Sequence, residues 1–329
     1  MTEALFTILL PVNRPPDLLP FAVESVLAQS ERRFRLCILS DGAPPETVEV
    51  ARSFATRDAR IEVFAFEKGE RHGEAHRHHV LTAADTEFVA QIGDDDLWFP
   101  DYLKELAKAL EHADFGNLPQ VEMTADGTCG VIAGSLGLAV VRERMLTEMW
   151  NLFGPTFAGY RLAAYRRLPV GWSPAPSAIW TDLFMWRKFL SSPDFRFATR
   201  FSIQGLKFAA HTRTSMSLEE RALEIRDIAA RLKSPLARAE LQIQALEALA
   251  DRQCFESLEL AEQKFRAEYG RLQSLHAQQQ SHWRSRMTEI AQATVAVRQT
   301  PAWPILKKVG SVGQHIDRIS ELASSGEPD

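Results

Sequence analysis

Short apolar runs alternate with amphipathic stretches over the first hundred residues, and this alternation limits the fold more than any other feature. Strands are predicted at residues 6–10, 34–39, 60–66 and 88–92, and helices at residues 17–29, 45–55 and 73–84. The connections are short, which favours right-handed crossovers between parallel strands. The chain is therefore predicted to have an α/β fold with a mostly parallel, Rossmann-type sheet and flanking helices.

A polar turn follows each of the four predicted strands. Ligands of a parallel sheet bind beyond the carboxyl ends of its strands, so these turns are expected to share one ligand-binding edge. The turns are Pro11-Val12-Asn13-Arg14, Ser40-Asp41-Gly42, Glu67-Lys68-Gly69 and Gly93-Asp94-Asp95-Asp96.

The fourth turn carries three adjacent aspartates, Asp94, Asp95 and Asp96, between Ile92 and the apolar run 97–99. A solvated acidic loop would explain an isolated triplet, but these neighbours are expected to be buried. Burying like charges side by side is costly unless a cation is present. Mg²⁺ typically uses one or two carboxylates together with substrate phosphates. The triplet therefore predicts a Mg²⁺ or Mn²⁺ ion that carries a diphosphate.

Overall composition excludes several protein classes. The net charge of −5 and the pI near 6.0 provide no basic surface for nucleic acid. Cys37, Cys129 and Cys254 are few and widely spaced, which fits neither a disulfide framework nor a zinc pattern and favours a reducing cytoplasm. The longest nearly uncharged run, residues 129–141, is shorter than the ~20 residues that span a bilayer. A cytoplasmic protein is expected, and a peripheral position on the inner face of the plasma membrane stays open.

The pattern changes twice after residue 112. Residues 113–217 are less regular, with a helix predicted at 181–190 and a β-hairpin or bent strand at 195–210. From residue 217 the chain is rich in Ala, Glu, Gln, Leu and Arg, which predicts a long helix or helical hairpin and leaves a short coiled coil open. We expect a catalytic domain at 1–217, divided at 112/113, and a helical extension at 218–329. Whether that extension covers the domain or joins a homo-oligomer stays open.

Several blocks of residues 6–112 are similar to the nucleotide-sugar-binding half of GT-A-type, family 2 glycosyltransferases. The resemblance implies a GT-A-like fold and inverting sugar transfer. The blocks are FTILLPVNRP, AVESVLAQ, FRLCILSDGAPPET and GEAHRHHVLTAADTEFVAQIGDDDLWFPDYL, followed later in the chain by WTDLFMWRKF and HTRTSMS.

This resemblance also implies roles for individual residues. The turn of Pro11, Val12 and Asn13 would contact the nucleobase, Asp41 would bond to its edge, and Arg77 would lie near the base or the diphosphate. The triplet Asp94 to Asp96 would bind the metal, with one member, assigned to the donor as Asp94, touching the ribose. His211 would be a third contact to the metal or the diphosphate, and Asp182 would be the catalytic base.

Elementary chemistry supports a base at Asp182. Inverting transfer needs a group that takes a proton from the acceptor hydroxyl, and positive charge on the departing diphosphate. Trp180 and the apolar residues after Asp182 favour a raised pKa for that carboxyl. Acids are also favoured in the first turn of any helix. The residues alone leave these readings even, and the resemblance favours catalysis.

Four histidines between residues 72 and 79 suggest a zinc site, because His72, His76 and His79 would share one helical face. No cysteine lies nearby, and Glu70 and Glu74 are the only local acids. The segment is instead predicted to form part of the donor-site wall.

The function expected from these features is metal-dependent, inverting transfer of a sugar from a nucleotide-diphosphate sugar to an acceptor hydroxyl, in glycan or polysaccharide biosynthesis. The acceptor would be a glycan, a lipid-linked glycan or a protein. One alternative is a nucleotidyltransferase, which would want a glycine-rich basic loop after the first strand, and LLPVNRPPD is not such a loop. Another is a non-catalytic nucleotide-sugar-binding scaffold, whose function would survive substitution of Asp182.

Overall fold

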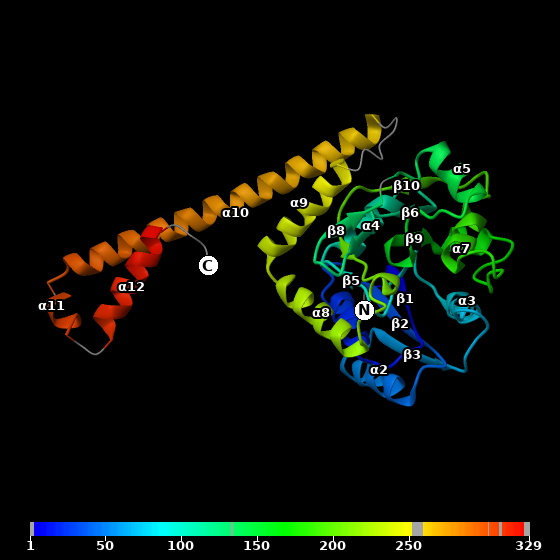
Figure 1. Cartoon of the computed structure of the whole chain (residues 1–329), viewed down its shortest axis with the longest axis horizontal. Helices are drawn as coiled ribbons and strands as arrows, with labels where there is room; N and C mark the ends of the chain where they lie inside the picture. Colours follow the sequence, from blue (N-terminus) through cyan, green and yellow to red (C-terminus); the bar gives the residue numbers. More distant parts are fainter. Residues whose placement is uncertain (1–2, 133, 252–258, 302, 309–310, 326–329) are drawn as a thin grey trace. The chain divides into compact units, whose positions relative to one another are not determined.

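The computed structural model of the chain describes residues 3–132, 134–251, 259–301, 303–308 and 311–325 (Figure 1). The chain divides into two compact units, Met1–Tyr269 and Gly270–Asp329. Cys37 is buried and Cys129 is half-buried, and both are free thiols, whereas Cys254 lies outside the described residues.

A seven-stranded sheet forms the centre of the first unit, in the order β10-β6-β9-β4-β1-β2-β3 (Figure 1). The four strands predicted in the first hundred residues are confirmed and pair in parallel. They are β1 (Phe6–Val12), β2 (Phe34–Asp41), β3 (Ile61–Phe66) and β4 (Phe88–Gln91). The second half adds β9 (Ala158–Arg161), antiparallel to both of its neighbours, with β6 (Phe115–Asn117) and β10 (Phe197–Thr199) beyond it.

The helices predicted at residues 17–29, 45–55, 73–84 and 181–190 are confirmed as well. They are α1 (Leu19–Leu27), α2 (Pro45–Arg57), α3 (Glu74–Ala83) and α7 (Thr181–Leu190). A further helix, α4 (Tyr102–Leu110), follows the aspartate triplet. Helix α1 buries Leu19, Ala22, Val23 and Val26, which recur at the spacing of one helical face. A proline stands in the first turn of α2, where its fixed φ suits the helix and its missing N–H costs nothing.

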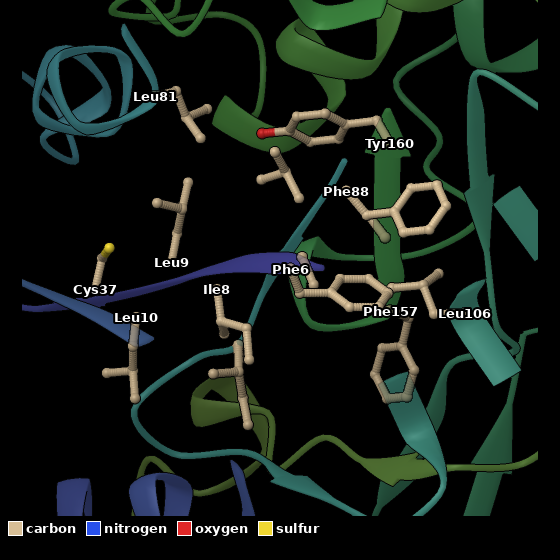
Figure 2. Close-up of a cluster of buried hydrophobic side chains, with 14 of the residues drawn as sticks. Phe6, Ile8, Leu9, Leu10, Cys37, Leu81, Phe88, Leu106, Phe157 and Tyr160 are labelled. Atoms are coloured by element: carbon tan, nitrogen blue, oxygen red, sulfur yellow. The ribbon is translucent and has the colours of Figure 1, made fainter. Parts of the chain in front are cut away.

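The core lies along β1 and the strands beside it. Phe6, Ile8, Leu9 and Leu10 of β1 are fully buried, because a strand in the middle of a sheet covered on both faces presents every side chain to the interior. Figure 2 shows these side chains with Phe88 of β4 and other members of the cluster. The unbroken apolar run of β1 determines where this strand ends. The ligand edge of the sheet lies at that carboxyl end.

Residues 195–210 do not form a hairpin, so that part of the prediction is wrong. Strand β10 joins the large sheet beside β6, whereas β11 (Gly205–Leu206) pairs with β5 (Leu97–Trp98) in a separate two-stranded sheet. Another small sheet contains β7 (Val121–Met123) and β8 (Cys129–Val131). Strands β10 and β11 each pair with a strand far away in the sequence, which no local pattern reveals.

Further short elements lie between residues 139 and 212. They are α5 (Ala139–Thr147), η1 (Pro155–Phe157), α6 (Leu162–Arg167) and η2 (Ala210–Thr212).

The first unit continues past residue 217 through α8 (Leu218–Arg231) and α9 (Pro235–Asp251). Helix α8 packs on α1, and α9 packs on β8. Arg213, whose side chain is fully buried, donates to Glu224 of α8 through Nε and Nη2, both at 2.6 Å. The predicted boundary at 217/218 therefore falls inside the first unit.

Helix α10 (Glu259–Gln299) begins in the first unit, and its residues from Gly270 onward belong to the second. The second unit also contains α11 (Trp303–Leu306) and α12 (Val312–Ser325). Arg298 and Asp317 join α10 to α12 by an ion pair of 2.5 Å. The predicted helical extension is thus present, and its role in a homo-oligomer or a coiled coil stays a prediction. None of the helices in the described part of the chain is long and apolar enough to cross a membrane.

We expect chains shortened at two different positions to behave differently. A chain that ends at Ser217 loses the buried side chains Ile225, Leu246 and Leu249, each of which contributes roughly 2 kcal/mol. Its melting temperature should fall by on the order of 10 °C or more, since stability margins are small. A chain that ends at Tyr269 should keep the melting temperature of the first unit in calorimetry. Equal melting of the two shortened chains would show that α8 and α9 are dispensable for the fold.

Candidate active site

A cavity of about 220 Å³ opens at the carboxyl edge of the sheet. It is lined by residues from the ends of β1, β2 and β4 together with residues from more distant segments. The lining consists of Pro11, Val12, Asn13, Arg14, Asp41, His72, Arg77, Gln91, Gly93, Asp94, Asp95, Asp96, Pro155, Thr156 and Lys207. The three polar turns that follow β1, β2 and β4 therefore meet here, together with Arg77 of α3.

Asp41, the last residue of β2, is buried and held by three groups. Its Oδ2 accepts a hydrogen bond from Lys68 Nζ at 2.6 Å, its Oδ1 accepts one from the Gly69 amide at 2.6 Å, and His76 Nε2 lies 3.3 Å from Oδ1. Burial opposes ionisation, but the lysine and the amide outweigh it, so the pKa of Asp41 lies below its usual value. Gly73, at φ +67°, passes so close that a Cβ there would lie 2.7 Å from Asp41 Cγ.

Helix α3 places the buried Arg77 in the cavity wall. Arg77 Nη1 donates to the His72 carbonyl at 2.7 Å, and the guanidinium lies 5.2 Å from the ring centroid of Trp172. Its Nε has no acceptor among the residues that the structure describes. The start of α3 is tied to the start of α7, because Thr181 Oγ1 donates to the fully buried Glu74 at 2.9 Å. This contact fixes α7 relative to the cavity.

The aspartate triplet meets an arginine on its cavity side. Arg14 Nε lies 3.0 Å from Asp94 Oδ2, and Arg14 Nη1 donates to Asp95 Oδ2 at 3.1 Å. The Asp94 contact is outside hydrogen-bond geometry, so Asp94 Oδ2 is a buried acceptor with no donor in the described residues. Burial raises the pKa of Asp94 to about 7, against the opposing effect of Arg14.

Asp96 is held differently from its two neighbours. It is buried, its Oδ2 accepts a hydrogen bond from Thr156 Oγ1, and its Oδ1 accepts one from the Phe208 amide at 3.0 Å. Thr156 Oγ1 also accepts from the Gly93 amide at 3.0 Å, so one hydroxyl joins η1 to the triplet loop. Burial raises the pKa of Asp96, and Lys207 opposes that shift. Asp95 is the most exposed of the three and also accepts from Arg221 of α8 at 2.7 Å.

Asp182, in the first turn of α7, lies near Lys207 but is not among the residues that line the cavity. A Cβ on Gly154 would lie 3.8 Å from Asp182 Oδ2 and 3.7 Å from Lys207 Nζ, so both groups face the same point of the backbone. Asp182 Oδ2 accepts from Asn151 Nδ2 at 2.9 Å, and Oδ1 accepts from the Leu183 amide at 2.8 Å. Burial raises the pKa of Asp182 despite these donors.

The predicted site histidines have different surroundings and do not form one cluster. His76 stacks on Phe66 with ring centroids 4.2 Å apart, and His78 Nδ1 lies 2.7 Å from Tyr165 Oη. His72 lines the cavity, and His211 is exposed in η2. Within the described ranges, no group of three or more His, Cys, Asp or Glu side chains is placed to hold a metal ion. His211 is therefore not gathered with the triplet into such a group.

Sequence reasoning did not assign five residues that the structure brings to this site: Arg14, Asn151, Thr156, Lys207 and Arg221. Arg14 belongs to the turn after β1 that was predicted at the ligand-binding edge, although no role was assigned to it. Asn151, Thr156 and Arg221 contact aspartates across 31 to 126 positions of sequence, and Lys207 interacts with aspartates electrostatically. A lone lysine in the apolar run 205–210 is a weak signal for Lys207, and no signal marked Arg221 in its helix.

Residues 7–166 match the model of the family described as glycosyl transferase family 2. Just under half of the chain is therefore similar to this family. The predicted resemblance and the predicted fold class are thereby confirmed. The match ends before α7, so Asp182, Lys207 and Arg221 lie outside the part of the chain that the family model covers.

Two sequence relatives each match about a third of this chain. Uncharacterized protein y4gI of Sinorhizobium fredii is 32% identical over 113 residues, which make up 33% of this chain and 12% of that protein. Succinoglycan biosynthesis protein ExoW of Rhizobium meliloti is 29% identical over 113 residues, which make up 34% of this chain and 35% of that protein. This chain therefore matches only a minor part of either relative's length.

Solved structures share the fold at low identity. The crystal structure of S. aureus TarS 1-349 is 14% identical, covers 83% of this chain and 91% of its own, and has a TM-score of 0.50. The same protein in complex with UDP-GlcNAc is 16% identical, covers 82% of this chain and 80% of its own, and has a TM-score of 0.51. These likenesses establish a shared GT-A-like fold.

The double role of Thr156 yields a stability prediction. Replacing it with valine keeps the shape but removes the donor to Asp96 and the acceptor for Gly93, leaving buried polar groups without partners. Thr156→Val should lower the free energy of unfolding by about 2–3 kcal/mol in urea titrations. Thr82→Val, on the exposed face of α3, should change it by less than about 0.5 kcal/mol. Equal values for the two variants would contradict a supporting role for Thr156.

Proposed function

We propose that this protein transfers a sugar from a nucleotide-diphosphate sugar to an acceptor hydroxyl with inversion at the anomeric carbon. One observation carries the proposal: a carboxyl with a raised pKa, Asp182, lies near Lys207, which lines the same cavity as the aspartate triplet. A proton acceptor and a cationic cradle for a leaving diphosphate are the two components that this reaction needs. The similarity to family 2 supports the assignment.

The donor nucleotide is proposed to bind across the ends of β1 and β2. The backbone of Pro11, Val12 and Asn13 lines the cavity beside Asp41, which can accept hydrogen bonds from a base edge because its pKa keeps it ionised. Arg77 supplies a buried cation with an unused donor, which suits an anionic diphosphate. Asp94 is proposed to contact the ribose of the same ligand.

Transfer is proposed to be a single displacement. The acceptor oxygen bonds to the anomeric carbon as its proton passes to Asp182, and the bond from that carbon to the diphosphate oxygen breaks. The electron pair leaves with the nucleoside diphosphate, whose charge Lys207 and Arg14 stabilise from inside the cavity. Attack from the side opposite the leaving group inverts the configuration.

The carboxylates of the triplet suit a divalent cation such as Mn²⁺ or Mg²⁺. Among the described residues Asp94 Oδ2 is a buried acceptor without a donor, and both oxygens of Asp96 accept hydrogen bonds from Thr156 and Phe208. We therefore propose Asp95 and Asp94 as the ligands, with Asp96 fixing their loop. The exposed His211 is not part of this proposed ligand set. A cation bound there would stabilise charge on the leaving diphosphate.

The proposed pathway class is glycan or polysaccharide biosynthesis, which the similarity to succinoglycan biosynthesis protein ExoW supports. The proposed acceptor is a hydroxyl of a free, lipid-linked or protein-linked glycan, and the proposed location is the cytoplasm or the inner face of the plasma membrane. The second unit is proposed to join two copies of the chain, a role that fits its exposed Trp283 and Ile290.

Substitution of Asp182 tests the reaction. We expect Asp182→Asn to lower the rate of nucleoside diphosphate release from UDP- and GDP-sugars by roughly 10²–10⁴-fold, because the general base is lost. Binding of UDP or GDP in calorimetry should change little. Asp194→Asn, an exposed acid just beyond α7, should behave as the unchanged protein. A fully active Asp182→Asn variant that still binds the nucleotide would favour a non-catalytic role for the chain.

The pH dependence of the rate reports on the same carboxyl. Asp182 must be ionised to accept a proton, so the rate should rise as pH rises through its raised pKa. Asn151 donates to that carboxylate and lowers its pKa, so Asn151→Ala should move this rising limb to higher pH. Rate profiles of both proteins, with UDP or GDP binding as the control for folding, measure the shift. A limb that stays in place would exclude Asp182 as the titrating base.

A further inference from the structure

Two guanidinium groups converge on one carboxylate oxygen at the triplet. Arg14 Nη1 lies 3.1 Å and Arg221 Nη2 lies 2.7 Å from Asp95 Oδ2. Arg14 lines the cavity, whereas Arg221 reaches Asp95 from α8 and is absent from the cavity wall. The other oxygen of Asp95, Oδ1, lies toward the triplet loop, where a Cβ on Gly93 would be 3.2 Å away.

Helix α8 is anchored so that Arg221 is held in this position. Ser217 and Glu220 form a reciprocal capping box at the start of α8. One turn later, Glu224 receives both hydrogen bonds from the buried Arg213, and Ile225 is buried. Arg221 shares the face of these two residues, at spacings of three and four, and its side chain is only 11% exposed. Its contact with Asp95 is thus part of a built interface.

Cationic side chains surround the triplet. Arg14 and Arg221 contact it directly, and Lys207 interacts electrostatically with Asp96 and Asp95. Without Arg221, the negative charge of Asp95 would face an incoming diphosphate with only Arg14 to offset it. Such like-charge repulsion is strong at partly buried sites.

We propose that Arg221 is a positioning residue that neutralises the charge of Asp95 from α8, outside the cavity wall. The cavity can then bind a nucleoside diphosphate with reduced dependence on a divalent metal. This inference rests on the proposed function and deepens it. It makes the segment beyond residue 217 a component of the donor site. Arg221 and a divalent cation would compensate the same carboxylate, so the loss of one increases the need for the other.

Calorimetry of nucleoside diphosphate binding tests the proposal, with UDP and GDP as probes, in EDTA and in Mn²⁺. Arg221→Gln should weaken binding about tenfold in EDTA and by less than about threefold in Mn²⁺. The ratio of the two dissociation constants should therefore rise several-fold relative to the unchanged protein. Arg221→Lys, which keeps the charge, should restore most of the EDTA affinity. Arg226→Gln is the matched control, because Arg226 is exposed on the same helix and pairs only with its neighbour Asp227 in the described structure.

A purely structural role for Arg221 gives a different result. Arg221→Gln would then lose affinity equally in EDTA and in Mn²⁺, or lose none, and either outcome overturns the proposal. If Arg221→Gln fails to fold, the double variant Asp95→Asn/Arg221→Gln removes both charges together and replaces it. Relative to Asp95→Asn alone, that variant should show no further loss in EDTA, and a further tenfold loss would overturn the proposal. If the unchanged protein binds neither UDP nor GDP in either solution, the proposed function fails before the role of Arg221 is reached.

Discussion

The site depends on keeping three adjacent carboxylates at the edge of a buried sheet. Their mutual repulsion and desolvation would oppose folding, so each must be paired or hydrogen-bonded. The structure meets this requirement with a different partner for each: Arg14 faces Asp94, Arg14 and Arg221 share Asp95, and Thr156 holds Asp96 with the Phe208 amide. These partners come from the β1 turn, α8, η1 and the segment after β11. The triplet is therefore the point at which distant parts of the first unit are tied together.

The same three residues consequently differ in what they can do. Asp96 has both oxygens engaged by the protein and supports the loop, whereas Asp95 and Asp94 keep capacity for a ligand. Identical side chains thus differ in hydrogen bonding because their surroundings differ. Asp182 stands apart from this cluster, on a helix fixed by the contact between Thr181 and Glu74. Its pKa is therefore raised by burial rather than by the charges of the triplet.

The first hundred residues were predictable because their signals are local. Apolar runs mark β1 to β4, and parallel pairing alone brings Asp41 and the triplet to one edge. The second half was not predictable in the same way. Strand β9 enters the large sheet antiparallel, and β11 leaves the expected hairpin to pair with β5, because each strand is chosen by tertiary neighbours rather than by its own pattern. The pairing of β11 with β5 is what places Lys207, the next residue, at the site.

Arg221 shows the same limit from another direction. Its helix has ordinary surface composition, and nothing in the sequence distinguishes Arg221 from Arg226 on the exposed face. What separates them is the orientation of α8, which the buried Arg213 fixes through Glu224. That ion pair has no contact with the cavity, yet it decides which arginine meets Asp95. A helical segment that resembles a separate extension in the sequence can therefore influence the electrostatics of a site formed mainly by the sheet. The first unit includes α8 because of this charged contact as well as because of its apolar core.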